Sequence, residues 1–249
     1  MIFGTVEKWA DDGHALKGKG TGIEDAIKAG FDTFDTAPVY LNEKEVGNDL
    51  EGIFQVQSKL DYFKWGYENV IEEFEKSSEH LSITTYLIHW PVLPLKELKE
   101  TWRAFEYLKN EGQVEKIGVC NFTIKHLQKL LDICEIPPDI NQFELNIFCQ
   151  NDELINECKR HNIEVQSYSS ICRGKPPSLP GETSISSGVM LDWLLSKGVN
   201  PIVRSTKINR LQEMIKLESG LTERSLDHYK EYDRQFRLCP DPNTMGDWS

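Results

Sequence analysis

Residues 85–119 read TYLIHWPVLPLKELKETWRAFEYLKNEGQVEKIGV and contain one complete structural unit. The apolar run Thr85–Ile88 predicts a buried strand. Leu95–Asn110 follows with apolar residues at helical spacing, which predicts a helix that closes at Glu111-Gly112. A second apolar run, Lys116–Val119, predicts the next strand. A strand, a helix and another strand within about 35 residues are typical of a parallel strand–helix–strand unit.

The same unit repeats along the chain, with eight strands and eight helices in strict alternation. The expected strands are Ile2–Thr5, Thr33–Asp35, Phe54–Ser58, Thr85–Ile88, Lys116–Val119, Ile140–Leu145, Glu164–Ser167 and Pro201–Val203. The expected helices are Gly22–Ala29, Asn42–Leu50, Glu68–Leu81, Leu95–Asn110, Thr123–Cys134, Asn151–His161, Ser186–Lys197 and Asn209–Leu217. Eight such units predict an α/β fold, a (β/α)8 TIM barrel, as a single domain over residues 1–249.

An open, doubly wound sheet is the competing fold, but no G-x-G-x-x-G motif follows the first strand. The longest irregular stretch is Ser169–Ser187, which is rich in Pro, Gly and Ser. A second irregular stretch is the tail from about Cys239 to Ser249, which we expect to fold over one end of the barrel.

The overall composition argues against some classes of binding partner. With 28 Lys and Arg against 40 Asp and Glu, the formal net charge is -12, which argues against nucleic acid. No apolar run approaches the roughly 20 residues that span a bilayer, and the first residues lack the pattern of a secretory signal. The six cysteines are dispersed without a C-x-x-C pair, so we expect reduced thiols, no metal site and a cytoplasmic location. The oligomeric state is left open, with a monomer among the alternatives.

Four polar residues stand at consecutive strand ends. Asp35 ends the second strand and Tyr40 follows five residues later, while Lys59 and His89 close the third and fourth strands. Because barrel active sites lie at the carboxyl ends of the strands, we expect these four side chains to meet. Taken singly, each has a structural explanation as a turn residue, a half-buried aromatic, a solvated lysine or a core histidine. Only their joint placement favours a functional site.

The residue types suggest a reaction. A tyrosine phenol has an ordinary pKa of about 10, and we expect the Lys59 ammonium to lower the pKa of Tyr40 while Asp35 balances the lysine's charge. We expect His89 to orient a substrate oxygen. Such a site protonates an oxyanion while a hydride reaches the carbonyl carbon, and the hydride must come from a cofactor because side chains carry none.

Several segments resemble the aldo-keto reductase family. The segment AGFDTFDTAPVYLNE at 29–43 resembles the family signature around the catalytic Asp and Tyr. The other matching segments, in family order, are QSKL at 57–60, LIHWP at 87–91, GVCNF at 118–122, NQFEL at 141–145 and VQSYS at 165–169. The resemblance runs from about Gly4 to Ile215.

The resemblance implies roles for individual residues. Tyr40 is the general acid, completed by Asp35, Lys59 and His89, and Trp90 joins Tyr40 and His89 at the substrate. The residues that hold NADPH or NADP+ are Gly4, Thr5, Asp35, Asn121, Gln142, Tyr168, Ser169, Arg204, Ser205, Thr206 and Arg210. Among these, Asn121 and Gln142 bind the nicotinamide carboxamide and Tyr168 stacks on the ring. Arg204 and Arg210 grip the 2′-phosphate, which favours NADPH over NADH.

The chain also departs from the family pattern. We expect the usual N-terminal hairpin to be lacking, Leu41 replaces the Gly after the tyrosine, and 170–172 replace a Pro-Leu-Gly segment. Three functions stay open. The first is reduction of a small-molecule aldehyde or ketone to an alcohol, and the second is a reductase dedicated to one pathway ketone or enone. The third is a non-catalytic or regulatory NADPH-binding barrel. The sequence does not identify the substrate or the physiological direction.

Overall fold

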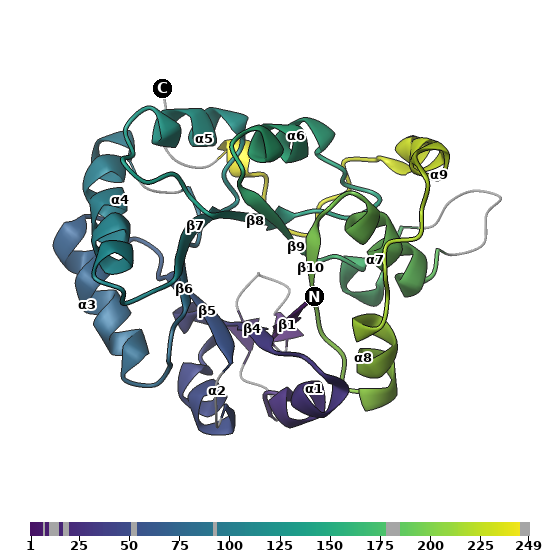
Figure 1. Cartoon of the computed structure of the whole chain (residues 1–249), viewed down its shortest axis with the longest axis horizontal. Helices are drawn as coiled ribbons and strands as arrows, with labels where there is room; N and C mark the ends of the chain where they lie inside the picture. Colours follow the sequence, from purple (N-terminus) through teal and green to yellow (C-terminus); the bar gives the residue numbers. More distant parts are fainter. Residues whose placement is uncertain are drawn as a thin grey trace.

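The computed structural model describes residues 1–6, 8–9, 15–16, 20–50, 54–91, 94–177 and 185–244. Eight parallel strands close into a barrel in the order β1-β10-β9-β8-β7-β6-β5-β4 (Figure 1). The barrel strands are β1 (Ile2–Gly4), β4 (Thr33–Asp35), β5 (Gln55–Leu60), β6 (Thr85–Ile88), β7 (Lys116–Cys120), β8 (Ile140–Glu144), β9 (Glu164–Tyr168) and β10 (Asn200–Val203). Pairing of β1 with β4 closes the ring, so the predicted (β/α)8 barrel is confirmed.

Helices surround the barrel, one in each connection between successive strands and one after the last (Figure 1). They are α1 (Ile23–Ala29), α2 (Glu43–Asp49), α3 (Tyr67–Ser78), α4 (Leu95–Asn110), α5 (Ile124–Leu131), α6 (Asp152–Arg160), α7 (Ser187–Ser196) and α8 (Ile208–Ile215). All eight expected helices are present, with ends shifted by at most a few residues. The largest shifts are at the carboxyl ends of α3 and α5, where the apolar periodicity continues past the last helical turn.

Local sequence explains individual boundaries. Gly30 ends α1 in a left-handed conformation with φ 104°, and its N–H donates to Ala26 and Ile27 carbonyls. At the start of α5, Thr123 and His126 form a capping box: the backbone N–H of Thr123 donates to His126 Nδ1 at 3.2 Å. The cap residue lies two residues after Asn121, and α5 begins directly after it, so the cap fixes the chain that leaves the end of β7.

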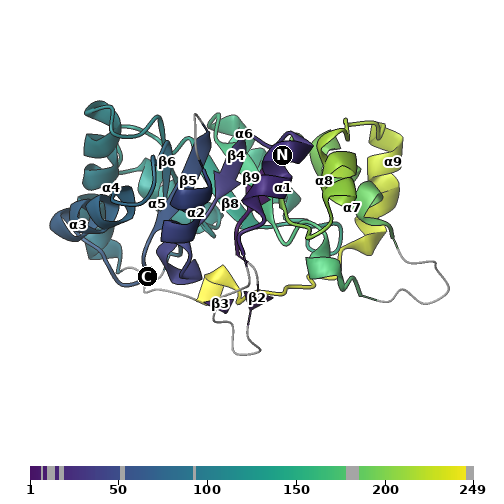
Figure 2. The same cartoon turned by 90° about the horizontal axis from the view of Figure 1, so that it is seen from below.

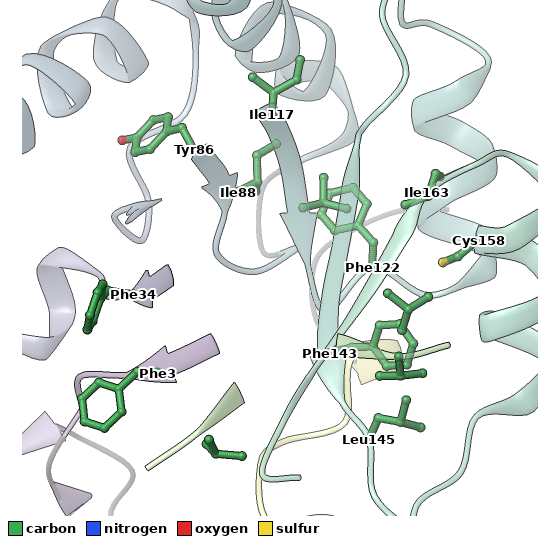
Figure 3. Packing of buried hydrophobic residues seen from close by; sticks show 14 of the residues in the cluster. Phe3, Phe34, Tyr86, Ile88, Ile117, Phe122, Phe143, Leu145, Cys158 and Ile163 are labelled. Atoms are coloured by element: carbon green, nitrogen blue, oxygen red, sulfur yellow. The ribbon is translucent and has the colours of Figure 1, made fainter. Parts of the chain in front are cut away.

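Strand alternation divides the buried residues into two sets. On β5, Val56 and Leu60 belong to the main apolar cluster, whereas Gln57 and Lys59 turn the other way, into the barrel. The main cluster lies between strands and helices, and Figure 3 shows Phe3, Phe34, Ile117 and Phe143 among its members. The barrel thus has an apolar outer layer and a partly polar interior.

Some described elements were not expected. Strands β2 (Lys8–Trp9) and β3 (Ala15–Leu16) pair antiparallel in the connection after β1, so this pair follows the first barrel strand. A helix α9 (Glu223–His228) and the 3-10 helices η1 (Pro38–Tyr40), η2 (Cys172–Gly174), η3 (Tyr229–Tyr232) and η4 (Pro242–Thr244) are also present. Figure 2 shows the β2–β3 pair and the yellow tail segment at the same end of the barrel.

The tail is attached to the barrel at the end of β8. The buried Glu144 carboxylate accepts the backbone N–H groups of Leu238 and Cys239 at 2.7 and 3.0 Å. The structure describes the tail as far as Thr244, and 245–249 lie outside the described residues. Part of the expected Ser169–Ser187 loop, 178–184, lies outside them as well. Over the described part of the chain, no helix is long and apolar enough to cross a membrane.

Gly118 on β7 tests how tightly the strands pack. A Cβ there would lie 2.6 Å from the Ile140 carbonyl oxygen on β8 and 2.8 Å from Leu87 Cδ2. Because the first contact is backbone, we expect Gly118→Ala to lower the free energy of unfolding by about 1–3 kcal/mol in urea titrations. Gly188 in α7 is the matched control: its added Cβ would be 3.8 Å from the nearest atom, so Ala there should be neutral or mildly stabilising. Equal effects at both positions would contradict this packing argument.

Candidate active site

Asp35, at the carboxyl end of β4, is the centre of a buried polar cluster. Its Oδ2 accepts hydrogen bonds from Lys59 Nζ at 2.7 Å, Gln57 Nε2 at 2.7 Å and Gln142 Nε2 at 2.9 Å. These partners come from β5 and β8, and parallel strands bring their side chains to one end of the barrel. Three side-chain donors, one of them charged, thus converge on one oxygen of a buried carboxyl group.

Lys59 is fully buried, and all three of its protons have acceptors. Nζ donates to Asp35 Oδ2, to the Thr36 carbonyl oxygen at 2.8 Å and to Tyr40 Oη at 3.3 Å. The ammonium also lies 5.0 Å from the centroid of the Tyr40 ring. An ammonium with no exposed surface needs a counter-charge, and Asp35 supplies it.

Tyr40 closes the 3-10 helix η1, and Leu41 ends this helix in a left-handed conformation with φ 57°. The expectation that the Tyr40 pKa lies below its ordinary value is wrong. Burial raises the pKa of the phenol well above its ordinary value, and the Asp35 charge raises it further. The physical reason is that the Lys59 charge is paired with Asp35, while removal of the phenol from water disfavours the phenolate. Tyr40 is thus kept as a protonated phenol.

His89 follows β6 and lies against Tyr40, with ring centroids 5.9 Å apart and planes at 85°. Burial, together with the Lys59 charge, holds the pKa of His89 well below its ordinary value, so the imidazole is neutral. Trp90 follows directly, and its side chain hydrogen-bonds to that of Tyr62. The four residues expected to meet do lie together, with Trp90 beside them.

The residues predicted to hold a nicotinamide lie at the adjoining strand ends. Tyr168 Oη donates to Asn121 Oδ1 at 2.7 Å, and Gln142 joins Asp35. Asn121 and Ser169 both have left-handed backbones, with φ 64° and 53°. Such conformations in residues other than glycine often accompany functional sites, because the surrounding structure must hold them.

Arg204 ties the end of β10 to the start of the chain. Its Nη1 donates to the carbonyl oxygens of Gly4 at 3.1 Å, Thr5 at 3.1 Å and Thr21 at 2.6 Å, and Nη2 to that of Gly20 at 3.3 Å. The guanidinium also lies over the Phe3 ring, 5.4 Å from its centroid. These bonds give Arg204 a structural role, and its predicted contact with a phosphate stays a prediction.

The remaining predicted cofactor residues form a separate group. Ser205, Thr206 and Arg210 lie at the start of α8, and the Arg210 side chain is exposed. Ser205 Oγ accepts the backbone N–H of Lys207 at 3.1 Å. The structure therefore has one cluster in the barrel mouth and a second, basic group at a helix N-terminus, a position that favours anions.

The carbonyl contacts of Arg204 predict a stability effect. We expect Arg204→Lys to lower the free energy of unfolding by about 1–3 kcal/mol. A single ammonium cannot make the hydrogen bonds that the two Nη atoms of the guanidinium donate to these carbonyl oxygens. Chemical unfolding of the protein without cofactor measures the change. Lys207→Met, at an exposed neighbour, is the control and should unfold like the wild type. An unaltered Arg204→Lys protein would contradict the structural role.

Some residues of the site were not anticipated from the sequence. Gln57 and Gln166 lie inside the barrel, with Gln57 Nε2 donating to Gln166 Oε1 at 3.0 Å as well as to Asp35. Tyr62 stacks on His89. The signal for Gln57 was its even spacing from Lys59, which puts both side chains on the same face of a strand. For Tyr62, in a loop, the sequence carries no such signal.

Comparison with known proteins identifies the family. Residues 3–176 match the profile described as the aldo/keto reductase family. The chain is 33% identical over 244 residues to the uncharacterized oxidoreductase YtbE of Bacillus subtilis (strain 168), which covers 90% of this chain and 86% of that protein. It is 32% identical over 240 residues to the glyoxal reductase of the same organism (90% and 86%). It is also 30% identical over 245 residues to the methylglyoxal reductase DkgA of Escherichia coli (strain K12), with 91% and 88% covered.

Solved structures of similar fold support the same family. The apo form of Gox0644 superposes with a TM-score of 0.83 at 29% identity, covering 98% of this chain and 93% of that one. A Gox0644 variant in complex with NADPH superposes with a TM-score of 0.82 at 28% identity, with the same coverage. The chain belongs to the aldo/keto reductase family.

Proposed function

We propose that this protein reduces an aldehyde or ketone to an alcohol with NADPH, and that Tyr40 gives the proton. The observation that carries the proposal is the Lys59 ammonium, which joins the Asp35 carboxylate to the Tyr40 hydroxyl inside the barrel. A buried ion pair is costly in free energy because both charges leave water. Stability alone therefore does not account for a pair whose lysine also donates a hydrogen bond to a phenol. It is well suited to support a phenol that gives up a proton.

The residues present fit NADPH at both of its ends. Asn121 and Gln142 offer amide donors and acceptors beside the Tyr168 ring, which matches a nicotinamide carboxamide and its flat ring. We propose that Ser205, Thr206 and Arg210 bind the 2′-phosphate at the start of α8, where Arg204 holds the segment against Gly4 and Thr5. A relative of known structure, a Gox0644 variant, is in complex with NADPH, which supports this assignment.

The proton step follows from the site. NADPH supplies the hydride when it is bound. The substrate oxygen becomes negative as the carbonyl is reduced, and the Tyr40 phenol is the buried acid beside it. Because the pKa of Tyr40 is raised, its proton leaves only when a stronger base forms. The alkoxide that arises from the substrate is such a base. Lys59 then stabilises the tyrosinate, and His89, being neutral, donates a hydrogen bond to the substrate oxygen.

For the substrate class, we propose small α-oxoaldehydes, on the strength of the glyoxal and methylglyoxal reductases among the relatives. A reducing compartment such as the cytoplasm suits the six cysteines, which are all free thiols.

The function is tested in two steps. Fluorescence titration with NADPH and NADH measures binding, and loss of the reduced-nicotinamide absorbance with glyoxal, methylglyoxal and larger aldehydes measures turnover. We expect tighter binding of NADPH than of NADH and turnover of at least the small oxoaldehydes. Tight binding without turnover on any carbonyl compound, pathway ketones and enones included, would instead favour a non-catalytic NADPH-binding barrel.

A further inference from the structure

The His89 ring is not oriented by a hydrogen bond at Nδ1. This atom is buried and, within the described residues, has no hydrogen-bond partner. Histidines that act on a substrate through one ring nitrogen are usually fixed by a hydrogen bond at the other nitrogen. The backbone of His89 is held, because Asn121 Nδ2 donates to its carbonyl oxygen at 3.0 Å. This bond does not define the rotation of the ring, so packing must define it.

Tyr62 provides that packing. Its ring stacks on the imidazole with centroids 4.9 Å apart and planes at 30°, while Tyr40 meets the imidazole edge-on. Aromatic contacts of these two geometries are favourable beyond the area that they bury. Two rings at different angles leave the imidazole little freedom to turn.

Tyr62 is itself anchored at both ends. Its backbone N–H donates to Asp61 Oδ1 at 2.8 Å, and its hydroxyl oxygen accepts a hydrogen bond from the Trp90 indole N–H. Burial raises the pKa of Tyr62 to about 12, so the hydroxyl stays neutral. Since Trp90 follows His89 in the chain, the stacked ring is tied to the segment that it orients.

The space around these rings is nearly filled. The cavity lined by Leu60, Asp61, Tyr62, Trp65, Ile88, His89 and Trp90 has a volume of about 10 Å3. That is room for about one water molecule and far less than a rotating imidazole needs. Removal of the Tyr62 ring would open this space.

We propose that Tyr62 is the positioning residue for His89, with its stacked ring holding the imidazole in the orientation that addresses the substrate oxygen. The proposal rests on the proposed carbonyl reduction. Tyr62 acts through His89 and not on the proton, because Tyr40, and not Tyr62, receives the Lys59 hydrogen bond. The ring is therefore the essential part of Tyr62 and the hydroxyl its anchor.

Three variants separate this role from general packing. Tyr62→Leu removes the ring but leaves an apolar side chain, and Tyr62→Phe keeps the ring without the hydroxyl. Phe63→Leu is the matched control, because Phe63 is the next residue, is 71% exposed and has its ring against Trp65. Each is tested for NADPH affinity, for kcat and KM with methylglyoxal, and by 15N NMR of the His89 ring without substrate.

We expect Tyr62→Leu to lower kcat by about 10- to 100-fold with NADPH affinity unchanged, because a small misplacement of an orienting group has effects of that size. Its His89 ring nitrogens should show altered or exchange-broadened signals. Tyr62→Phe should restore most of kcat and the native signals, and Phe63→Leu should match the wild type throughout.

Two results would overturn the proposal: wild-type His89 signals in Tyr62→Leu, or equal losses of kcat in Tyr62→Leu and Phe63→Leu. The NMR measurement needs no turnover. If the wild-type protein reduces no carbonyl compound, the proposed function fails while the orientation of His89 by Tyr62 is still decided.

Discussion

Replacing Tyr40 by Phe is expected to lower kcat for carbonyl reduction by about 10²- to 10⁴-fold, the usual contribution of a positioned general acid. Phenylalanine retains the ring contacts with His89 and the Lys59 ammonium, and removes only the hydroxyl that Lys59 Nζ reaches at 3.3 Å. NADPH affinity should change by less than about twofold, because its predicted ligands lie elsewhere. Steady-state kinetics and a fluorescence titration give both numbers.

The control for Tyr40→Phe is Leu41→Ala, at an exposed neighbour that is 62% accessible. It should fold and bind NADPH normally, and any change should appear in KM. If Tyr40→Phe reduced carbonyl compounds at the wild-type rate, the proton would have to come from another group. Loss of NADPH affinity together with turnover would indicate misfolding.

Replacing Lys59 by Met is expected to cost about 3–5 kcal/mol of unfolding free energy and to abolish turnover. The substitution removes the positive charge from a site with no solvent exposure and leaves the Asp35 carboxylate with only the Gln57 and Gln142 amides. The carboxylate then remains buried without a counter-charge. Urea unfolding at neutral pH measures the loss.

The double variant Asp35→Asn with Lys59→Met is the informative comparison. It removes both charges and should recover a large part of the stability, although not the activity. If the double variant were less stable than Lys59→Met by the full effect of Asp35→Asn, the two side chains would be energetically independent. That result would contradict the ion pair on which the site is built.

The barrel was predictable because its signals are local. Each strand is a short apolar run and each helix has apolar residues at regular spacing, so eight alternating units are countable without tertiary information. Helix α9 was missed because it is short, and its start depends on one hydroxyl, with Thr222 accepting the Ser225 N–H. The β2–β3 pair was missed because two-residue strands have no periodicity.

The site was only partly predictable, for a different reason. Asp35, Tyr40, Lys59 and His89 stand at strand ends, and strand ends of a parallel barrel converge. What each neighbour does to the others depends on burial, which the sequence does not contain. The pKa of Tyr40 shifts opposite to the expected direction, and Arg204 directs its donors to carbonyl groups. Tyr62 lies in a loop, and no pattern in the sequence predicts that its ring contacts His89.

The central claim, transfer of a hydride to a carbonyl carbon in this barrel, is tested most directly by isotope transfer. The wild-type protein is mixed with NADPH that carries deuterium at the transferable position of nicotinamide C4, and methylglyoxal is added in ordinary water. We expect loss of the reduced-nicotinamide absorbance and an alcohol product with one deuterium on the new carbinol carbon, seen by mass spectrometry. An alcohol without deuterium, or no reaction of the bound cofactor with any carbonyl compound, would contradict the account.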